Sequence, residues 1–484
     1  MGRAHRTSAW ILGFILAGAA FPTAAEDPAF GSKPNIVFLF SDDQSYQTIA
    51  AHGFDEIQTP NLDRLARAGT TFSHAYNMGS WSGAVCIASR MMLNSGRSVW
   101  HAQRAHAMGD TERQAGRWWS EYMKAAGYRT YMTGKWHTPA NVHLSFDVVR
   151  DPRPGMPSDT PVAYNRPSAS GPDPWSPTDG TQGGYWAGGK HWTEVAGDHS
   201  VNFIQQAAKE EVPFFMYLAF NAPHDPRQSP QQFVDLYPLD QIRIPANFLP
   251  DYLYADAIGC GPSLRDERLA PFPRTAEAVA RHRQEYFAII THLDEQVGRI
   301  LDALEATGKA DNTWIFFTSD HGLAIGQHGL LGKQNQYDHS IRVPFMVVGP
   351  GVEAGRMIDE PIYLQDVMPT SLALAGLTAP DHVEFQNLLP LLRGEPSRYS
   401  AIYGSYLQLQ RCIRTRHHKL MLYPKAGVMR LFDLQNDPDE RQDLADQPSL
   451  QPLIRKLFAQ LRELQRQFDD PLDLTAVFPE LIEN

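Results

Sequence analysis

Short apolar runs alternate with helical patterns along most of the chain. The apolar runs lie at residues 36–40, 128–132, 214–220, 314–317 and 345–348. Short apolar runs that end in polar or turn residues predict buried strands. Between them, residues 61–68 and 275–307 place apolar side chains at helical spacing. Strands separated by helices predict an α/β domain with a mainly parallel sheet flanked by helices.

The pattern changes near residue 376, where the segments become shorter. Four apolar runs follow at residues 401–406, 412–415, 419–423 and 429–434. Their close spacing predicts an antiparallel sheet, and residues 450–468 carry the pattern of an amphipathic helix. We predict a large domain over residues 26–375 and a smaller C-terminal α+β subdomain over residues 376–484. Residues 151–192, rich in Pro, Gly and aromatic side chains, are predicted to form a long ordered excursion.

The N-terminal segment has the pattern of a secretory signal peptide, which we predict for residues 1–25. Arg3 and Arg6 precede an apolar stretch at residues 10–21, and small residues follow at 23–25. This stretch is shorter than the roughly 20 residues that span a bilayer. We therefore expect a secreted or periplasmic protein with no membrane span.

Charge and cysteine content narrow the class of protein. The 484 residues carry a formal net charge of −11, from 43 basic and 54 acidic side chains. A mildly acidic chain lacks the basic face of a nucleic-acid binder, so we expect no nucleic-acid partner. Three cysteines, Cys86, Cys260 and Cys412, are too few to staple a chain of this size. Cys260 and Cys412 could pair, but we expect both to be buried free thiols.

Ionisable residues follow four of the predicted strands. They are Asp42, Asp43, Lys135, His137, His224, Asp320 and His321. In parallel α/β sheets, ligands bind beyond the carboxyl ends of the strands. One such ending would be an ordinary surface loop, whereas four at one edge predict a shared site.

Cys86 precedes a segment that has the pattern of a helix. A nucleophile at a helix N-terminus meets the positive end of the helix dipole and unpaired N–H groups. That environment suits a tetrahedral oxyanion such as sulfate or phosphate, and Arg90 adds a fixed positive charge one turn later. For an isolated cysteine, a buried free thiol would be the simpler interpretation.

The context of Cys86 favours the catalytic interpretation. The run Cys86-Ile87-Ala88-Ser89-Arg90, followed by Ser95-Gly96-Arg97, resembles the signature of the type I sulfatase family. The resemblance extends from about residue 33 to 445 and implies an alkaline-phosphatase-like fold for the large catalytic domain. In that family a maturase oxidises the cysteine to formylglycine (3-oxoalanine). One hydroxyl of the hydrated aldehyde attacks sulfur, and the other helps to expel sulfate.

Further motifs match the same family in the same order along the chain. One group of these motifs corresponds to the metal ligands of the family. By this resemblance the metal ligands are Asp42, Asp43, Cys86, Asp320 and His321. Three carboxylates favour a hard cation, so we expect Ca²⁺, with Mg²⁺ or Mn²⁺ left open.

The remaining matches imply sulfate contacts. Lys135 and His137, in Gly134-Lys135-Trp136-His137, resemble the residues that bind sulfate and orient the formylglycine diol. His224 and Lys333 resemble the other sulfate contacts, and either could protonate the leaving oxygen. With Cys86 and Arg90, these residues form the predicted catalytic set.

The resemblance implies hydrolysis of sulfate esters, and secretion together with aromatic-rich segments favours sulfated carbohydrates as substrates. A phosphonate monoester or phosphodiester hydrolase built on the same formylglycine site is an alternative, since its substrate also carries one negative charge. A two-zinc phosphodiesterase would need more histidines, such as His52, His328 and His339. A non-catalytic binder of sulfated glycans is a third alternative. Ala88 stands where the family often has Pro, which leaves the maturation route open.

Overall fold

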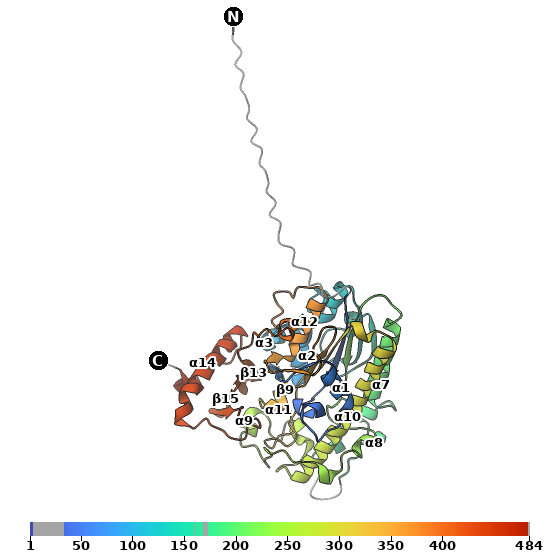
Figure 1. Cartoon of the computed structure of the whole chain (residues 1–484). Helices are drawn as coiled ribbons and strands as arrows, with labels where there is room; N and C mark the ends of the chain where they lie inside the picture. The colour runs from blue at the N-terminus through green and yellow to red at the C-terminus, as the bar shows by residue number, and fades with distance from the viewer. Residues whose placement is uncertain (3–32, 159, 168–172, 483–484) are drawn as a thin grey trace.

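An eight-stranded sheet with the order β11-β2-β10-β8-β1-β7-β5-β6 forms the centre of the protein (Figure 1). The structure is a computed structural model that describes residues 1–2, 33–158, 160–167 and 173–482. In the order of the sheet, the strands are Arg356–Ile358, Thr70–Phe72, Phe345–Val348, Thr313–Ser319, Asn35–Ser41, Phe214–Ala219, Arg129–Lys135 and Val148–Arg153. Strands β8, β1, β7, β5 and β6 run parallel, and β10 runs antiparallel to β8. The predicted mainly parallel sheet is confirmed.

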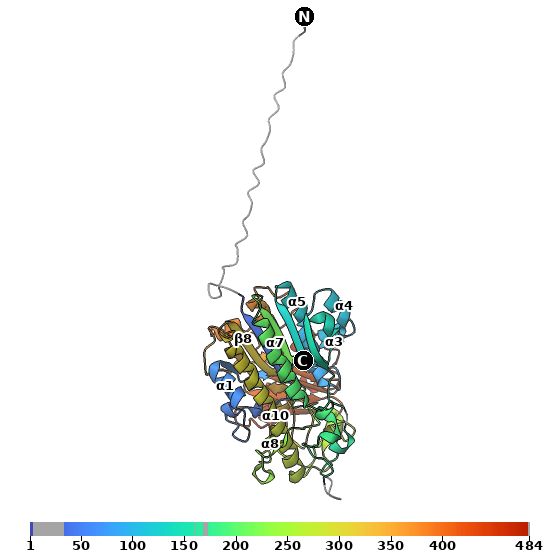
Figure 2. The same ribbon diagram turned by 90° about the vertical axis from the view of Figure 1, so that its right-hand side faces the viewer.

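Helices cover both faces of this sheet. Figure 2 shows α7 and α10 side by side on one face, with α1 beside them. Helices α2, α5 and α12 pack together on the opposite face. The bounds of these helices are Trp192–Ala207, Ala276–Ala306, Pro60–Ala68, Val85–Ser95, Trp119–Ala125 and Val367–Leu374.

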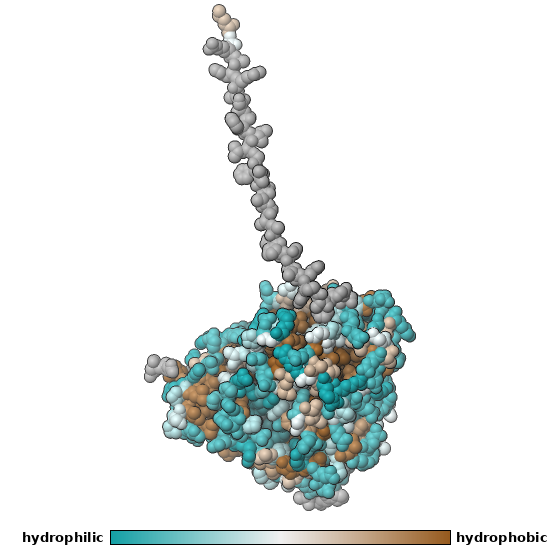
Figure 3. Space-filling model, viewed as in Figure 1, coloured by the Kyte–Doolittle hydropathy of each residue, from teal (hydrophilic) through white to brown (hydrophobic). Residues whose placement is uncertain are grey.

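Strand β1 shows how the chain fills two cores at once. Val37 and Leu39 pack into the core below α7 and α10, whereas Phe38 and Phe40 pack into the core below α2 and α5. Successive side chains of a strand point to opposite faces, so a strand buried on both faces needs a continuous apolar run. The face seen in Figure 3 is mostly hydrophilic, with small hydrophobic patches, because these runs lie inside.

A second, five-stranded sheet with the order β16-β15-β14-β13-β4 forms the C-terminal part. Strands β13 to β16 are antiparallel neighbours at Ile402–Tyr406, Gln410–Arg414, His418–Tyr423 and Val428–Asp433. Helix α14 (Gln451–Gln467) packs on this sheet at one end of the molecule (Figure 1). The fifth strand, β4 (Gly79–Ser80), comes from the N-terminal part of the chain and runs parallel to β13. The sheet is therefore joined directly to the segment that precedes Cys86.

Several further predictions have structural outcomes. Cys260 and Cys412 are buried free thiols, as expected. Within the excursion after β6, Tyr185 and Trp192 are buried in the core, so they pack the segment down. Among the described residues, no helix has the length and apolarity needed to cross a bilayer. Apart from its first two residues, the predicted signal peptide lies outside the described part of the chain.

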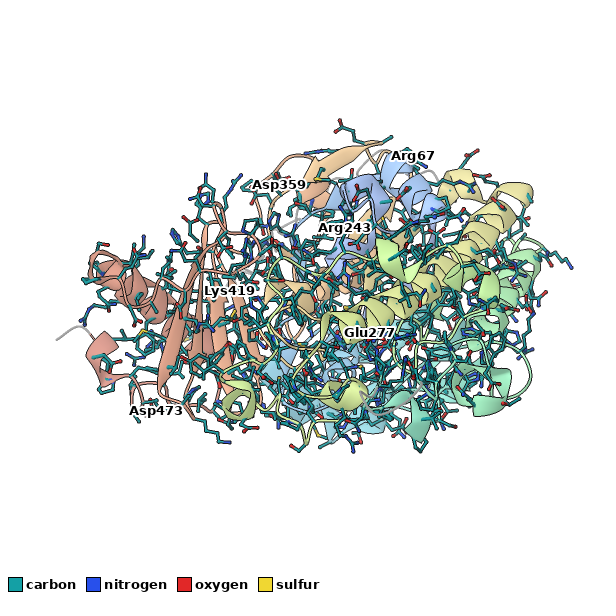
Figure 4. All side chains as sticks on the ribbon, turned by 90° about the horizontal axis from the view of Figure 1, so that it is seen from below. Arg67, Arg243, Glu277, Asp359, Lys419 and Asp473 are labelled. Atoms are coloured by element: carbon teal, nitrogen blue, oxygen red, sulfur yellow. The ribbon has the colours of Figure 1, made fainter. Side chains whose placement is uncertain are left out.

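A buried ion cluster joins the C-terminal sheet to the large body. Lys419, labelled on this sheet in Figure 4, is fully buried. Its Nζ lies 2.5 Å from Asp338 Oδ1 and 2.7 Å from Glu440 Oε1. Asp338 begins α11 (Asp338–Ile341), and its backbone N–H donates to Glu440 Oε2 at 2.7 Å. Removing one partner of a buried ion pair leaves the other charge without compensation, which is costly.

Replacing this lysine should therefore loosen the contact between the two sheets. We expect Lys419→Met to lower the free energy of unfolding by about 3–5 kcal/mol, because Glu440 loses its cation and Asp338 loses the nearest of its cations. Urea unfolding measures the change. The matched control is Lys425→Met, an exposed lysine in the turn between β15 and β16, which should change stability by less than about 0.5 kcal/mol. Equal stability of the two variants would contradict this assignment.

Candidate active site

The carboxyl ends of neighbouring strands bring the predicted ionisable residues to one place. Asp42 and Asp43 follow β1, Lys135 ends β5, His224 follows β7 and Asp320 follows β8. These four strands are adjacent in the sheet, in the order β8-β1-β7-β5. All five residues are buried, so the site lies within the molecule above this edge.

Cys86 is the second residue of α2 and points into this cluster. Its Sγ lies 3.3 Å from His321 Nε2, 3.4 Å from Lys333 Nζ and 3.9 Å from Asp43 Oδ1. The helix ends at Ser95, because Gly96 adopts a positive φ of 70° that glycine accommodates without strain. The side chain of Cys86 is only 2% exposed.

Three carboxylates crowd together beside Cys86. The backbone N–H of Asp43 donates to Asp320 Oδ1 at 3.1 Å. Burial, and then the charge of Asp320, raise the pKa of Asp42 well above its ordinary value. Burial would also raise the pKa of Asp43, but Lys333, together with two histidines, lowers it.

Each carboxylate has a buried cation of its own. Lys135 forms an ion pair with Asp42, and Lys333 Nζ lies 2.9 and 2.8 Å from the two carboxylate oxygens of Asp43. Arg90 Nε lies 3.1 Å from the third carboxylate, and its Nη1 donates to the backbone carbonyl of Lys135 at 3.0 Å. Because the charges alternate in sign, the fold can bury all of them.

The same cations act on the thiol of Cys86. Burial alone would raise the pKa of this thiol, but Lys135, Lys333 and His321 lower it well below the ordinary value. The site therefore stabilises negative charge at the position of Sγ. Positive groups held in a buried site favour an anion there more strongly than they would in water.

The donor set fits a divalent cation. Asp42, Asp43, Cys86, Asp320 and His321 each offer one atom, and these atoms lie within 4.8 Å of one another. Asp42 Oδ1 is buried and has no hydrogen-bond partner among the described residues, so a cation would satisfy it. His321 Nδ1 lies 2.8 Å from a backbone carbonyl, which leaves Nε2 facing the cluster as the ligand atom. Clustered carboxylate oxygens suit Ca²⁺ or Mg²⁺.

Two residues of the site adopt backbone conformations that non-glycine residues seldom take. The φ angles are 69° at Asp43 and 53° at His137. Such conformations cost about 1–2 kcal/mol per residue and persist only where the surroundings enforce them. Gly155 of the excursion provides part of this packing, since a Cβ there would lie 2.4 Å from His137 Cε1. The excursion thus packs against the site as well as the core.

The histidines considered for a two-zinc site take other positions. His52 Nε2 lies 3.1 Å from Thr71 Oγ1. His328 and His339 stack on Tyr337, with ring centroids 3.8 and 5.5 Å away. All three are thus engaged outside the cluster around Cys86.

Several charged or polar groups next to the site, all of them buried except the half-buried Arg265, have no counterpart in the sequence-based predictions. They are Asp225, Arg265, Asp266, Glu267 and Gln334. Asp225 and Gln334 adjoin predicted residues, so proximity in the chain could have drawn attention to them. Arg265, Asp266 and Glu267 lie in an irregular stretch before α10, where neither a strand end nor a motif marks them.

Comparisons with known proteins agree along most of the chain. A family model described as sulfatase matches residues 34–377, and one described as N-sulphoglucosamine sulphohydrolase, C-terminal, matches residues 326–467. An arylsulfatase of Clostridium perfringens is 29% identical over 463 residues, covering 85% of this chain and 90% of the relative. An N-acetylglucosamine-6-O-sulfatase of Bacteroides thetaiotaomicron is 25% identical over 546 residues, covering 94% and 89%.

Solved structures share the fold. One, described as a complex with its substrate D-glucosamine-2-N,6-O-disulfate, superimposes with a TM-score of 0.71 at 23% identity. The match covers 91% of this chain and 99% of that one.

The donor set can be tested through the metal content of the protein. We expect Asp320→Ala to lower the affinity for a divalent cation by at least about 100-fold, because it removes a charged oxygen donor from a buried site. Elemental analysis after exhaustive dialysis measures the bound ion. Asp302→Ala is the control, since this carboxylate of α10 is largely exposed. Equal metal content in both variants would reject the assignment.

Proposed function

The chain belongs to the sulfatase family, whose alkaline-phosphatase-like fold it has, and we propose that it removes sulfate from sulfated carbohydrates with a nucleophile made from Cys86. Family membership makes the protein a sulfuric ester hydrolase. The observation that carries the finer proposal is the set of buried cations around Sγ, with Lys333 Nζ only 3.4 Å away. A sulfate ester bound there would meet positive charge on several sides.

The nucleophile is proposed to be formylglycine at position 86, which would supply a hydroxyl for attack on sulfur when its aldehyde is hydrated. A divalent cation held by Asp42, Asp43, Asp320 and His321 would offset the negative charge of the sulfate oxygens. Both groups fit the residues present, because the carboxylates lie within reach of Sγ and of one another.

The protein's own side chains bind the ester and move its protons. Lys135 and Lys333 hold the sulfate oxygens, and Arg90 holds the backbone carbonyl of Lys135 in place. His224 Nδ1 lies 2.7 Å from the carbonyl of Asp225, so its Nε2 faces the site, 3.8 Å from a carboxylate oxygen of Asp43. Protonated Nε2 or the Lys333 ammonium is thereby placed to donate a proton to the leaving oxygen.

His137 is proposed to orient the nucleophile. Burial lowers the pKa of its imidazole, and the neighbouring Cys86 opposes this shift. A neutral imidazole can accept a proton from a hydroxyl at the position of Sγ. Over the whole hydrolysis, water supplies the oxygen that ends on sulfur and the proton that ends on the leaving alcohol.

The proposal that the substrate is a carbohydrate is supported by the relatives and by the sequence. One relative is named an N-acetylglucosamine-6-O-sulfatase, and the C-terminal family model is described by a sulphohydrolase of N-sulphoglucosamine. The pattern of residues 1–25 supports a place outside the cytoplasm, where sulfated polysaccharides occur. Conversion of Cys86 further requires a maturase that accepts Ala88 in the motif.

The division into a catalytic domain and a C-terminal subdomain belongs to the same proposal. The catalytic residues all lie between positions 42 and 333, within the proposed catalytic domain at residues 26–375. Residues 376–484 contribute the antiparallel sheet that braces the segment before Cys86 through β4.

Removing the nucleophile tests the proposal. We expect Cys86→Ala to lower sulfate release from sulfated oligosaccharides by at least about 1,000-fold, while the unfolding temperature stays within a few degrees. Ion chromatography of released sulfate measures the activity, and mass spectrometry of the Cys86 peptide reports its conversion. Cys412→Ala, a buried thiol of the C-terminal sheet, is the control. Retained turnover without Cys86 would refute the role of this residue, and release of phosphonate but not sulfate would favour the phosphonate hydrolase alternative.

A further inference from the structure

We propose that the turn Arg265-Asp266-Glu267 is a positioning element that holds both candidate proton donors, His224 and Lys333, at the reacting centre. The inference rests on the function proposed above and assigns a task to residues that no motif marks. The turn begins η7 (Asp266–Leu269) and contributes one ionic side chain from each of three consecutive residues. Each side chain reaches a different part of the site.

Arg265 holds the surroundings of His224, the candidate proton donor that follows β7. Its guanidinium bonds both carboxylate oxygens of Asp225, at 2.6 and 3.4 Å, and it also bonds Asp266 Oδ1 at 2.5 Å. Asp225 Oδ1 lies 3.3 Å from His224 Nδ1, and its backbone carbonyl lies 2.7 Å from the same nitrogen. The orientation of the imidazole therefore depends on Asp225, which Arg265 holds in a two-bond fork.

Asp266 holds Lys333, the other candidate proton donor, through Gln334. Asp266 Oδ2 accepts a hydrogen bond from Gln334 Nε2 at 2.7 Å. Gln334 Oε1 in turn accepts the backbone N–H of Lys333 at 3.0 Å. Gln334 Nε2 also donates to the carbonyl of Gly83 at 3.2 Å, three residues before Cys86. One side chain thus connects the turn to both the lysine and the nucleophile segment.

Glu267 holds the backbone just before Lys333. Its two carboxylate oxygens accept the N–H groups of Leu331 and Gly332 at 3.0 and 2.9 Å. Arg274 Nη2 lies 2.6 Å from the same carboxylate, which is fully buried. A Cβ on Gly332 would lie 3.0 Å from Glu267 Oε1 and 2.6 Å from Gln334 Oε1, so the carboxylate fits closely against this backbone.

The two donors come from distant parts of the chain, yet the turn forms hydrogen bonds or ion pairs with residues next to both of them. Protonation of the leaving group requires the donor within hydrogen-bond reach of the leaving oxygen as the S–O bond breaks. That oxygen takes the electron pair of the S–O bond and a proton from Lys333 Nζ or His224 Nε2. The proton lost by the attacking hydroxyl passes to the neutral imidazole of His137, so one proton leaves the reacting groups and one enters them. A loosened turn would displace the donor without removing it.

The dependence of activity on the leaving group distinguishes a positioning role from a general loss of structure. An acidic phenol leaves without a proton, whereas a sugar alcohol needs one. We expect Asp266→Asn and Glu267→Gln to lower kcat/KM by about 100-fold for a sulfated sugar but by only about 10-fold for 4-nitrophenyl sulfate, because the aryl ester loses sulfate contacts but needs no proton donor. The same variants should bind inorganic sulfate about 10-fold more weakly by calorimetry, because Lys333 and His224 both face the anion.

Asp294→Asn is the matched control for these variants. Its carboxylate is also buried and also accepts two backbone N–H groups, from Asn61 at 3.1 Å and Leu62 at 2.7 Å. We expect this variant to lose stability while keeping the wild-type leaving-group ratio and sulfate affinity.

Each outcome decides one point. A turn variant whose leaving-group ratio and sulfate affinity match those of Asp294→Asn would overturn the positioning role. Should the turn variants fold poorly, Gln334→Met keeps all three ionic groups, and unchanged sulfate binding in it would also overturn the proposal. Failure of the wild-type protein to release sulfate from any ester would instead reject the proposed function. The comparison of sulfate affinity between the turn variants and Asp294→Asn would still test the positioning role of the turn.

Discussion

Burial of like charges beside Cys86 is the constraint on which the rest of the structure depends. Asp42, Asp43 and Asp320 cannot share a dry site unless positive groups are interleaved with them. Arg90 comes from α2 and Lys135 from β5, so two separate elements must dock correctly before the charges balance. The parallel sheet meets this demand because its strand ends converge on one edge.

Packing and hydrogen bonds also hold the charged groups of the site in place. Arg90 lies 4.6 Å from the ring centroid of Phe40 and bonds a backbone carbonyl as well as a carboxylate, so packing and hydrogen bonds fix it. The positive φ angles at Asp43 and His137 persist in this framework. A site fixed in this way needs little rearrangement when an anion enters, which is the source of electrostatic catalysis.

The sequence predicts those parts of the fold whose pattern is local. Strands β1, β7 and β8 are buried on both faces, so their apolar runs identify them, and the strand ends and the Cys86 motif identify most of the site. The antiparallel direction of β10 and the two-residue strand β4 depend on pairing with distant segments, which no local pattern records. The turn at Arg265-Asp266-Glu267 escapes prediction for the same reason, since its importance lies in contacts with residues far along the chain.

The pairing of β4 with β13 has a consequence for the order of events during synthesis. Residues 79–80 leave the ribosome early, whereas their partner strand, Ile402–Tyr406, leaves it near the end. The segment that leads into Cys86 therefore stays without its sheet partner while most of the chain is made. The maturase that our proposal requires would have that interval in which to bind the chain around the thiol. Once the sheet closes, Cys86 is 2% exposed, and the interval ends.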